Sequence, residues 1–118
     1  MKHEDSFYLL HMMDAIRLIE LYTTGKDEIL FFEDHLLQDG VIRQLEILGE
    51  AVKHLSQNLR KQYPSIPWLD IAGTRDKLIH DYFGVDVEKV WVMVQDDLPY
   101  LKDNLQIILD HLKPDKKD

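Results

Sequence analysis

Apolar residues recur at steps of three and four along nearly the whole chain, and this spacing restricts the fold more than any other feature. Residues spaced in this way lie on one face of an α-helix, whereas a half-buried strand alternates with a period of two. No stretch follows the strand pattern, and the sequence has no internal repeat. The spacing therefore predicts an all-α protein, an up-and-down bundle of four or five helices.

Glycine and proline residues divide the predicted helices. Pro64 should stop a long helix, Pro67 suits the first turn of a short one, and Gly73 separates that turn from the next helix. Asp86 can cap the last helix, which Pro99 should kink and not end, because the apolar stripe resumes without a phase change. We expect the helices over about residues 6–24, 33–63, 74–83 and 86–112, with a short turn from Pro67.

Gly40 and Gly49 interrupt the long helix, where each lowers helix stability by about 1 kcal/mol relative to alanine. Glycines in a packed helix often mark the close approach of a second helix. We expect such a neighbour at these positions, either within the chain or across a dimer.

The composition fits one soluble domain. Of 118 residues, 45% are hydrophobic and 31% are charged, which is enough to fill a core and keep the surface solvated. We expect one domain over residues 1–112 and a solvated tail over residues 113–118. The first residues are too acidic for a signal peptide, and no apolar run is long enough to span a bilayer. A cytoplasmic protein with no membrane partner is the expectation.

The formal net charge of −8 argues against a protein that coats nucleic acid without specificity, since phosphates bind to basic surfaces. It leaves open an enzyme that handles RNA in a small, locally basic cleft. The chain has no cysteine, and no pair of histidines with a carboxylate partner has the spacing of a helical metal site among the scattered His3, His11, His35, His54 and His111. We therefore predict neither a metal nor a cofactor.

The segment GTRDKLIHDYFGVD gathers side chains suited to phosphate chemistry. A histidine such as His80 can take or give a proton near neutral pH, and Arg75 presents a planar, charged fork that matches phosphate oxygens. Asp76, one turn before His80, could fix the imidazole tautomer. Tyr82 could contact the phosphate or stack on a base. These residue types suit RNA cleavage without a metal.

Helical spacing constrains how the motif residues can cooperate. Arg75 and His80 are five residues apart, so they lie about 140° apart around the helix axis and cannot reach one phosphate without distortion. Two copies packed side by side could, which favours a site shared between subunits. The alternative is structural: Arg-x4-His is a weak pattern, the helix dipole favours a histidine in the last turn, and Tyr82 and Phe83 could be core aromatics.

The octapeptide RDKLIHDY fits the R-x4-H-x-Y motif of HepT-like toxins, the minimal members of the HEPN superfamily. Three longer blocks of the sequence also resemble that family in order and spacing, namely VIRQLEILGEAVKHLS, PSIPWLDIAGTRDKLIHDYFGVD and VWVMVQDDLPYLKDNL. The resemblance extends from the first helix to near the C-terminus. It implies a HEPN helical bundle that forms a homodimer and brings two motifs together in one cleft.

The resemblance further implies a metal-independent endoribonuclease toxin that acts on tRNA or mRNA, with Arg75 and His80 as the catalytic pair. It implies a type VII-like toxin–antitoxin system, in which an MNT-type nucleotidyltransferase antitoxin silences the toxin by transferring AMP to the motif tyrosine, here Tyr82. A bulky, charged adenylate there would block the cleft and repel RNA. Asp76 stands where the wider superfamily often has asparagine, which puts negative charge near the RNA phosphate.

Two other functions fit the same residues. A non-catalytic HEPN dimer could dock the nucleotidyltransferase and present Tyr82, an interpretation that the acidic net charge and Asp76 favour. A nucleotide-binding sensor would instead show saturable ATP affinity in the isolated chain.

Charged residues near the motif or in the long helix allow two interpretations each. Lys77 could contact the RNA backbone, or it could simply be solvated. Arg43, Glu46 and Glu50, at steps of three and four, most simply form an ion-pair ladder worth a few tenths of a kcal/mol per pair. Alternatively, one of the two glutamates orients Arg75 in the cleft.

Overall fold

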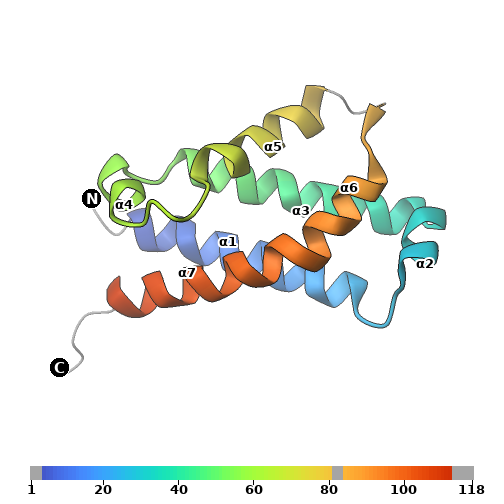
Figure 1. The fold of residues 1–118 in the computed structure, drawn as a ribbon, viewed down its shortest axis with the longest axis horizontal. Coiled ribbons are helices and arrows are strands. Elements are labelled where there is room, and N and C mark those ends of the chain that lie inside the picture. Colours follow the sequence, from blue (N-terminus) through green and yellow to red (C-terminus); the bar gives the residue numbers. More distant parts are fainter. Residues whose placement is uncertain (1–3, 81–83, 113–118) are drawn as a thin grey trace.

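Helices make up nearly all of the structure, a computed structural model that describes residues 4–80 and 84–112. In chain order they are α1 (Glu4–Thr23), α2 (Glu28–Glu33), α3 (His35–Lys53), α4 (Gln57–Gln62), α5 (Trp68–His80), α6 (Val87–Val92), the π-helical turn η2 (Met93–Asp97) and α7 (Leu98–Leu112). The described residues contain no strand. Figure 1 shows α1, α3, α5 and the unit from α6 to α7 running alternately in opposite directions, which confirms the all-α, up-and-down prediction.

The core is filled by the apolar stripes of α1, α3 and α7. Side chains with almost no solvent exposure are Leu9, Met12, Met13, Ile16 and Ile19 of α1, Val41, Leu45 and Val52 of α3, and Leu105 and Ile108 of α7. Burial of each large apolar side chain stabilises the fold by about 1.5–3 kcal/mol. In the part of the chain that the structure describes, no helix has the length and hydrophobicity needed to cross a membrane.

The single helix expected over residues 33–63 is wrong, because α2 ends at Glu33 and the chain then forms two separate helices, α3 and α4. Asp34 has an extended backbone that ends α2, and its carboxylate caps α3 by accepting a 3.0 Å hydrogen bond from the N–H of Leu37. Ser56 caps α4 in the same way, with 3.1 Å between its hydroxyl and the N–H of Leu59. Periodicity alone does not show such breaks, since N-caps act through their polar side chains and not through hydrophobicity.

The helix that carries the motif also differs from the prediction. We expected Gly73 to separate a short turn from a helix over residues 74–83, but α5 continues through this glycine from Trp68 to His80. Gly73 has no positive φ, and no atom lies within 4 Å of where its Cβ would be, so nothing forces a break there. The buried indole of Trp68 donates to two backbone carbonyls that precede it and anchors the start of the helix.

The last helical unit continues past Pro99, as predicted, and Asp86 caps its first turn through hydrogen bonds of 3.0 and 3.3 Å from two backbone N–H groups. The distortion precedes the proline and takes the form of η2, in which the N–H of Leu98 bonds to the carbonyl of Met93, five residues earlier. A proline ring clashes with the carbonyl four residues before it, and the wider π-helical turn gives that carbonyl room.

Candidate functional site

Helices α3 and α5 lie side by side (Figure 1), and they are in direct contact at Gly49. A Cβ atom on Gly49 would lie 2.9 Å from the carbonyl oxygen of Ile71 and still closer to the Cβ of Arg75. The missing side chain therefore lets α5 approach α3 and seats Arg75 against it. At Gly40, the ring of Tyr22 lies 3.4 Å from the corresponding position. The predicted close approach of a neighbouring helix is confirmed at Gly49, where that helix belongs to the same chain, whereas at Gly40 the contact with the Tyr22 side chain is an ordinary van der Waals one.

The Arg75 guanidinium is held by two carboxylates. Its Nε lies 3.2 Å from Oε1 of Glu50, and its Nη1 donates a 3.1 Å hydrogen bond to Oδ1 of Asp76. The side chain is 31% exposed. A guanidinium has five N–H donors, and these two contacts do not use all of them. Arg75 is therefore fixed in position while it retains donors for an anion.

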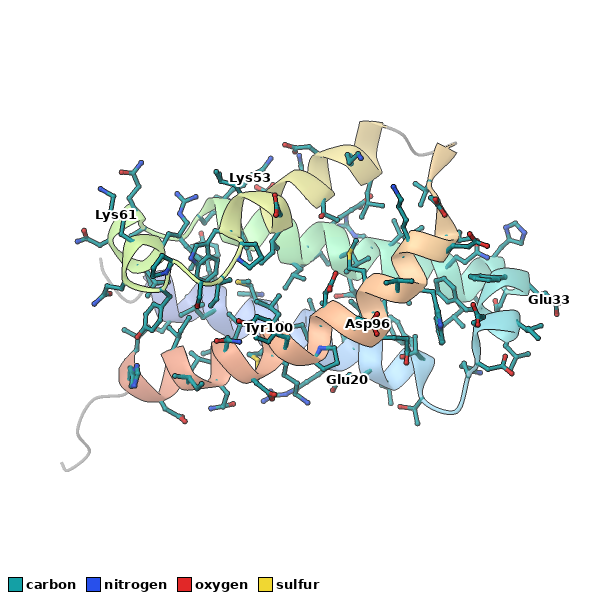
Figure 2. All side chains as sticks on the ribbon, viewed as in Figure 1. Glu20, Glu33, Lys53, Lys61, Asp96 and Tyr100 are labelled. Atoms are coloured by element: carbon teal, nitrogen blue, oxygen red, sulfur yellow. The ribbon has the colours of Figure 1, made fainter. Side chains whose placement is uncertain are left out.

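Asp76 links α5 to α3. The same Oδ1 that accepts from Arg75 also accepts a 2.6 Å hydrogen bond from Nζ of Lys53, a residue that lies beside α5 (Figure 2). The hydrogen bond from Lys53, followed by that from Arg75, lowers the pKa of the Asp76 carboxyl below its ordinary value of 3.8. The carboxylate is thus ionised throughout the neutral range. Its charge and that of Glu50 offset the two cations, so this ion-pair cluster is close to neutral.

Glu50 connects Arg75 to a histidine. Its Oε1 faces Arg75, and its Oε2 lies 3.2 Å from Nε2 of His54, the residue that caps the C-terminus of α3. Glu50 therefore makes the contact with Arg75 that the interpretation of an orienting glutamate requires. The ion-pair ladder is confirmed for Arg43 and Glu46, which lie 3.5 Å apart.

A groove of about 400 Å³ between α1, α3 and α5 opens beside this cluster. We call it the ring groove, because its lining includes Phe7, Tyr8, His11, Glu50, His54 and Arg75. The rings of Tyr8 and His54 stack with centroids 4.7 Å apart, and Phe7 meets His11 edge to face at 4.5 Å. Aromatic rings, imidazoles and a guanidinium with unused N–H donors thus line the same cavity.

The remaining motif residues are placed only in part. His80 is the last residue of α5, but its side chain is outside the described part of the structure, as is all of Tyr82. The expected contact between Asp76 and His80 therefore stays a prediction. Because α5 is continuous from Arg75 to His80, their backbone positions keep the separation of about 140° that helical geometry gives. Lys77 is exposed on the same helix.

The sequence interpretation missed Lys53 and the ring groove. Lys53 meets Asp76 across 23 positions, and no local pattern reports such a contact. His11 and His54 have no role in the sequence interpretation, which describes them only as scattered, yet both line the groove beside Arg75. The sequence did contain a signal for the α1 wall of the groove, since Phe7 and His11 are four residues apart and lie next to the buried apolar stripe. The described residues hold no group of three or more His, Asp and Glu side chains arranged to bind a metal ion.

A family model described as Ribonuclease HepT-like matches residues 12–108. A protein of Methanocaldococcus jannaschii named gamma-glutamylcyclotransferase and putative RNase is 43% identical over all of this chain, which spans about half (53%) of that relative. A probable ribonuclease HepT of Thermococcus cleftensis is 45% identical over 86% of this chain and 93% of its own length. A putative RNase of Caldanaerobacter subterraneus is 37% identical over 86% of this chain and 91% of its own length. No solved structure matches the chain.

Proposed function

The chain belongs to the HepT-like ribonuclease family, and from this premise we propose that it is a metal-independent endoribonuclease in which Arg75 and His80 carry the chemistry. The observation that supports the proposal most directly is the state of Arg75. Glu50 and Asp76 hold its guanidinium at the wall of the ring groove, and donors remain for a phosphate. A preorganised cation of this kind stabilises charge that develops on phosphate oxygens, and its removal typically costs about 100- to 1,000-fold in rate.

The reaction is an attack of the ribose 2′-oxygen on the neighbouring phosphorus. The 2′-hydroxyl loses its proton, the bond between phosphorus and the 5′-oxygen breaks, and the 5′-oxygen takes up a proton. The products are a 2′,3′-cyclic phosphate and a 5′-hydroxyl. His80 serves one of the two proton transfers, and Arg75 contacts the non-bridging oxygens as negative charge accumulates there. Lys77 contacts the RNA backbone from the exposed side of α5.

A homodimer completes the site in this proposal. The backbone positions of Arg75 and His80 lie about 140° apart around α5, so one phosphate is reached by Arg75 of one protomer and by His80 of the other. Mixing inactive Arg75→Ala and His80→Ala proteins, with subunit exchange, then restores up to about a quarter of the native activity, since half of the dimers are mixed and each has one intact site. Complementation does not occur if both residues serve from the same protomer.

Control of the site is the second part of the proposal. The chain is the toxin of a type VII-like toxin–antitoxin pair, tRNA or mRNA is its target, and an MNT-type nucleotidyltransferase transfers AMP to Tyr82. That tyrosine follows His80 by two residues, so the adenylate adds bulk and negative charge next to the proton-transfer group and repels the RNA backbone.

The test combines intact mass with RNA digestion. The protein is expressed with and without the nucleotidyltransferase, and each sample is weighed and incubated with total tRNA and mRNA. The unmodified protein should cut RNA, the co-expressed protein should gain adenylate mass on Tyr82 and lose cleavage, and Tyr82→Phe should block the mass gain. A protein that carries no adenylate and cuts no RNA would refute both parts of the proposal.

One observation favours the second candidate function, a non-catalytic dimer that docks the nucleotidyltransferase. The cations Lys53 and Arg75 are offset by Glu50 and Asp76, so the site is less basic than RNA binding alone would require. The Arg75→Ala variant separates the two functions. It abolishes growth inhibition and RNA cleavage under the first and leaves the behaviour of the cells unchanged under the second.

A further inference from the structure

The ring groove has two properties that a closed packing defect lacks. Its rings are accessible, since Phe7 is 49% exposed and the His54 side chain is 49% exposed. They are also ordered by one another, since Tyr8 stacks on His54 and Phe7 stands edge-on to His11. Exposing part of a large apolar ring is unfavourable in water, so a ligand that covers Phe7 gains by removing that surface from solvent.

Polar groups stand at the same wall. Arg43 and Glu46 lie on α3, and Glu50 and Arg75 form the ion pair described above. Carboxylates and guanidinium groups can pair with the donors and acceptors on the edge of a nucleobase, while rings cover its face. A cavity of about 400 Å³ is within the size range of small-ligand sites.

We propose that the ring groove is a nucleobase-binding subsite, which holds the base of a nucleotide adjoining the cleaved phosphate. This inference rests on the proposed ribonuclease function, because it takes Arg75 as the phosphate contact. Since Arg75 is part of the groove wall, a nucleotide whose phosphate meets the guanidinium has its base within reach of Phe7 and His11. The subsite thus fixes the RNA relative to the reacting atoms and contributes to the choice of cleavage position.

The test removes the ring and the base separately. Binding is measured by fluorescence anisotropy with 2′-O-methyl RNA oligonucleotides, which lack the attacking hydroxyl, and with copies that carry a single abasic position walked along the strand. Phe7→Ala should weaken binding of the intact strand about 10-fold, the size expected for loss of one stacking contact. When the abasic position is the one that occupies the subsite, the native protein should lose the same factor in binding affinity. On that strand the Phe7→Ala substitution should cause no further loss of affinity.

Two variants guard against indirect effects. Phe7→Leu keeps an apolar side chain without an aromatic face and should lose most of the affinity, as Phe7→Ala does. Tyr100→Ala removes a ring that is 56% exposed on α7, outside the groove, and should bind RNA like the native protein. The molecular mass in solution is measured for each variant.

Several results overturn the subsite. One is a Phe7→Ala variant that binds every strand as the native protein does, and another is an equal loss on intact and abasic strands at all positions. A third is a native protein that binds no 2′-O-methyl RNA, and a fourth is a loss of the dimer in Phe7→Ala, which would make the groove a subunit interface. Coupling between ring and base without cleavage of ordinary RNA supports the subsite and refutes the catalytic proposal, whereas cleavage without coupling does the reverse.

Discussion

Two grooves border the α3–α5 pair, and they differ in whether their acidic side chains are paired with cations. The ring groove holds aromatic rings, histidines and the Arg75 cluster. The second, which we call the acidic groove, is larger, at about 610 Å³, and lies between α3, α5, η2 and α7. Its walls are mainly apolar, and the carboxylates of Asp70, Asp96 and Asp97 line it without forming an ion pair to any described residue. Figure 2 shows Asp96 and Tyr100 on the last helical unit, apart from Lys53.

The proposed site is the smaller of the two grooves, because charge and not cavity size distinguishes them. A phosphate approaching the acidic groove meets three uncompensated carboxylates, whereas in the ring groove the acids are already paired with cations. The same two helices build both environments, because residues on different faces of α3, such as Leu48 and Glu50, point to different grooves. Carboxylates without an ion pair to a described residue thus line the acidic groove, while the acids of the ring groove are paired with arginines, as the proposed RNA site requires.

The largest effect should come from removing the cation of the ring groove. Arg75→Ala should lower kcat/KM for RNA cleavage by about 100-fold or more, since it removes a preorganised donor to the transition-state charge. Asp97→Asn, the matched change in the acidic groove, should leave the rate within about twofold, because the residue is remote from the phosphate. Initial rates of the unmodified proteins on one RNA decide the matter, and equal losses in both variants would contradict the difference between the grooves.

The next effect concerns the helix contact that separates the two grooves. Gly49→Ala adds a Cβ that meets Ile71 and Arg75, so we expect it to destabilise the fold by about 1–3 kcal/mol, the usual cost of overpacking. Gly73→Ala places the same group where no atom lies within 4 Å, and helix propensity should stabilise that variant by up to about 1 kcal/mol. Urea unfolding measures both, and changes of the same sign would show that the α3–α5 contact is looser than the structure indicates.

The two glycines also show what sequence could predict and what it could not. Periodicity gave the helical class, the direction of the helices and a close approach at Gly49, because these depend on which residues are apolar or lack a side chain. It misplaced the break at Gly73, since a glycine permits a turn without requiring one. The contacts of Arg75 with Glu50 and of Asp76 with Lys53 arise from α5 packing on α3, and spacing along the chain carries little information about such pairs.

The orientation of Arg75 by Glu50 should have an intermediate effect. Glu50→Gln keeps the size of the side chain but removes the charge that pairs with Nε, so the guanidinium is less well placed. We expect kcat to fall about 10-fold while KM does not rise, since loss of a negative charge favours RNA binding. A structural role alone would change the melting temperature and leave kcat intact, so both are measured, with Asp39→Asn, an exposed position outside the ring groove, as the control on the same helix.

The smallest effect should appear in the pH dependence of stability through Asp76. Its folded-state pKa lies below the ordinary value, so its contribution is fully present above the unfolded-state pKa of about 3.9 and is lost as the pH falls through the folded-state value. Asp76→Asn should therefore melt at a slightly lower temperature than the native protein at neutral pH, and this difference should shrink as the pH falls below about 4 and disappear once the pH is below the lowered folded-state pKa. Asp39→Asn, which alters an exposed carboxylate of α3 without an ion pair to the described residues, should show no such convergence. Because the Asp76 side chain is 48% exposed, solvent screens its ion pairs with Lys53 and Arg75, and the stability loss should be small. A large loss in Asp76→Asn would mean that Asp76 stabilises the fold through contacts other than these two ion pairs.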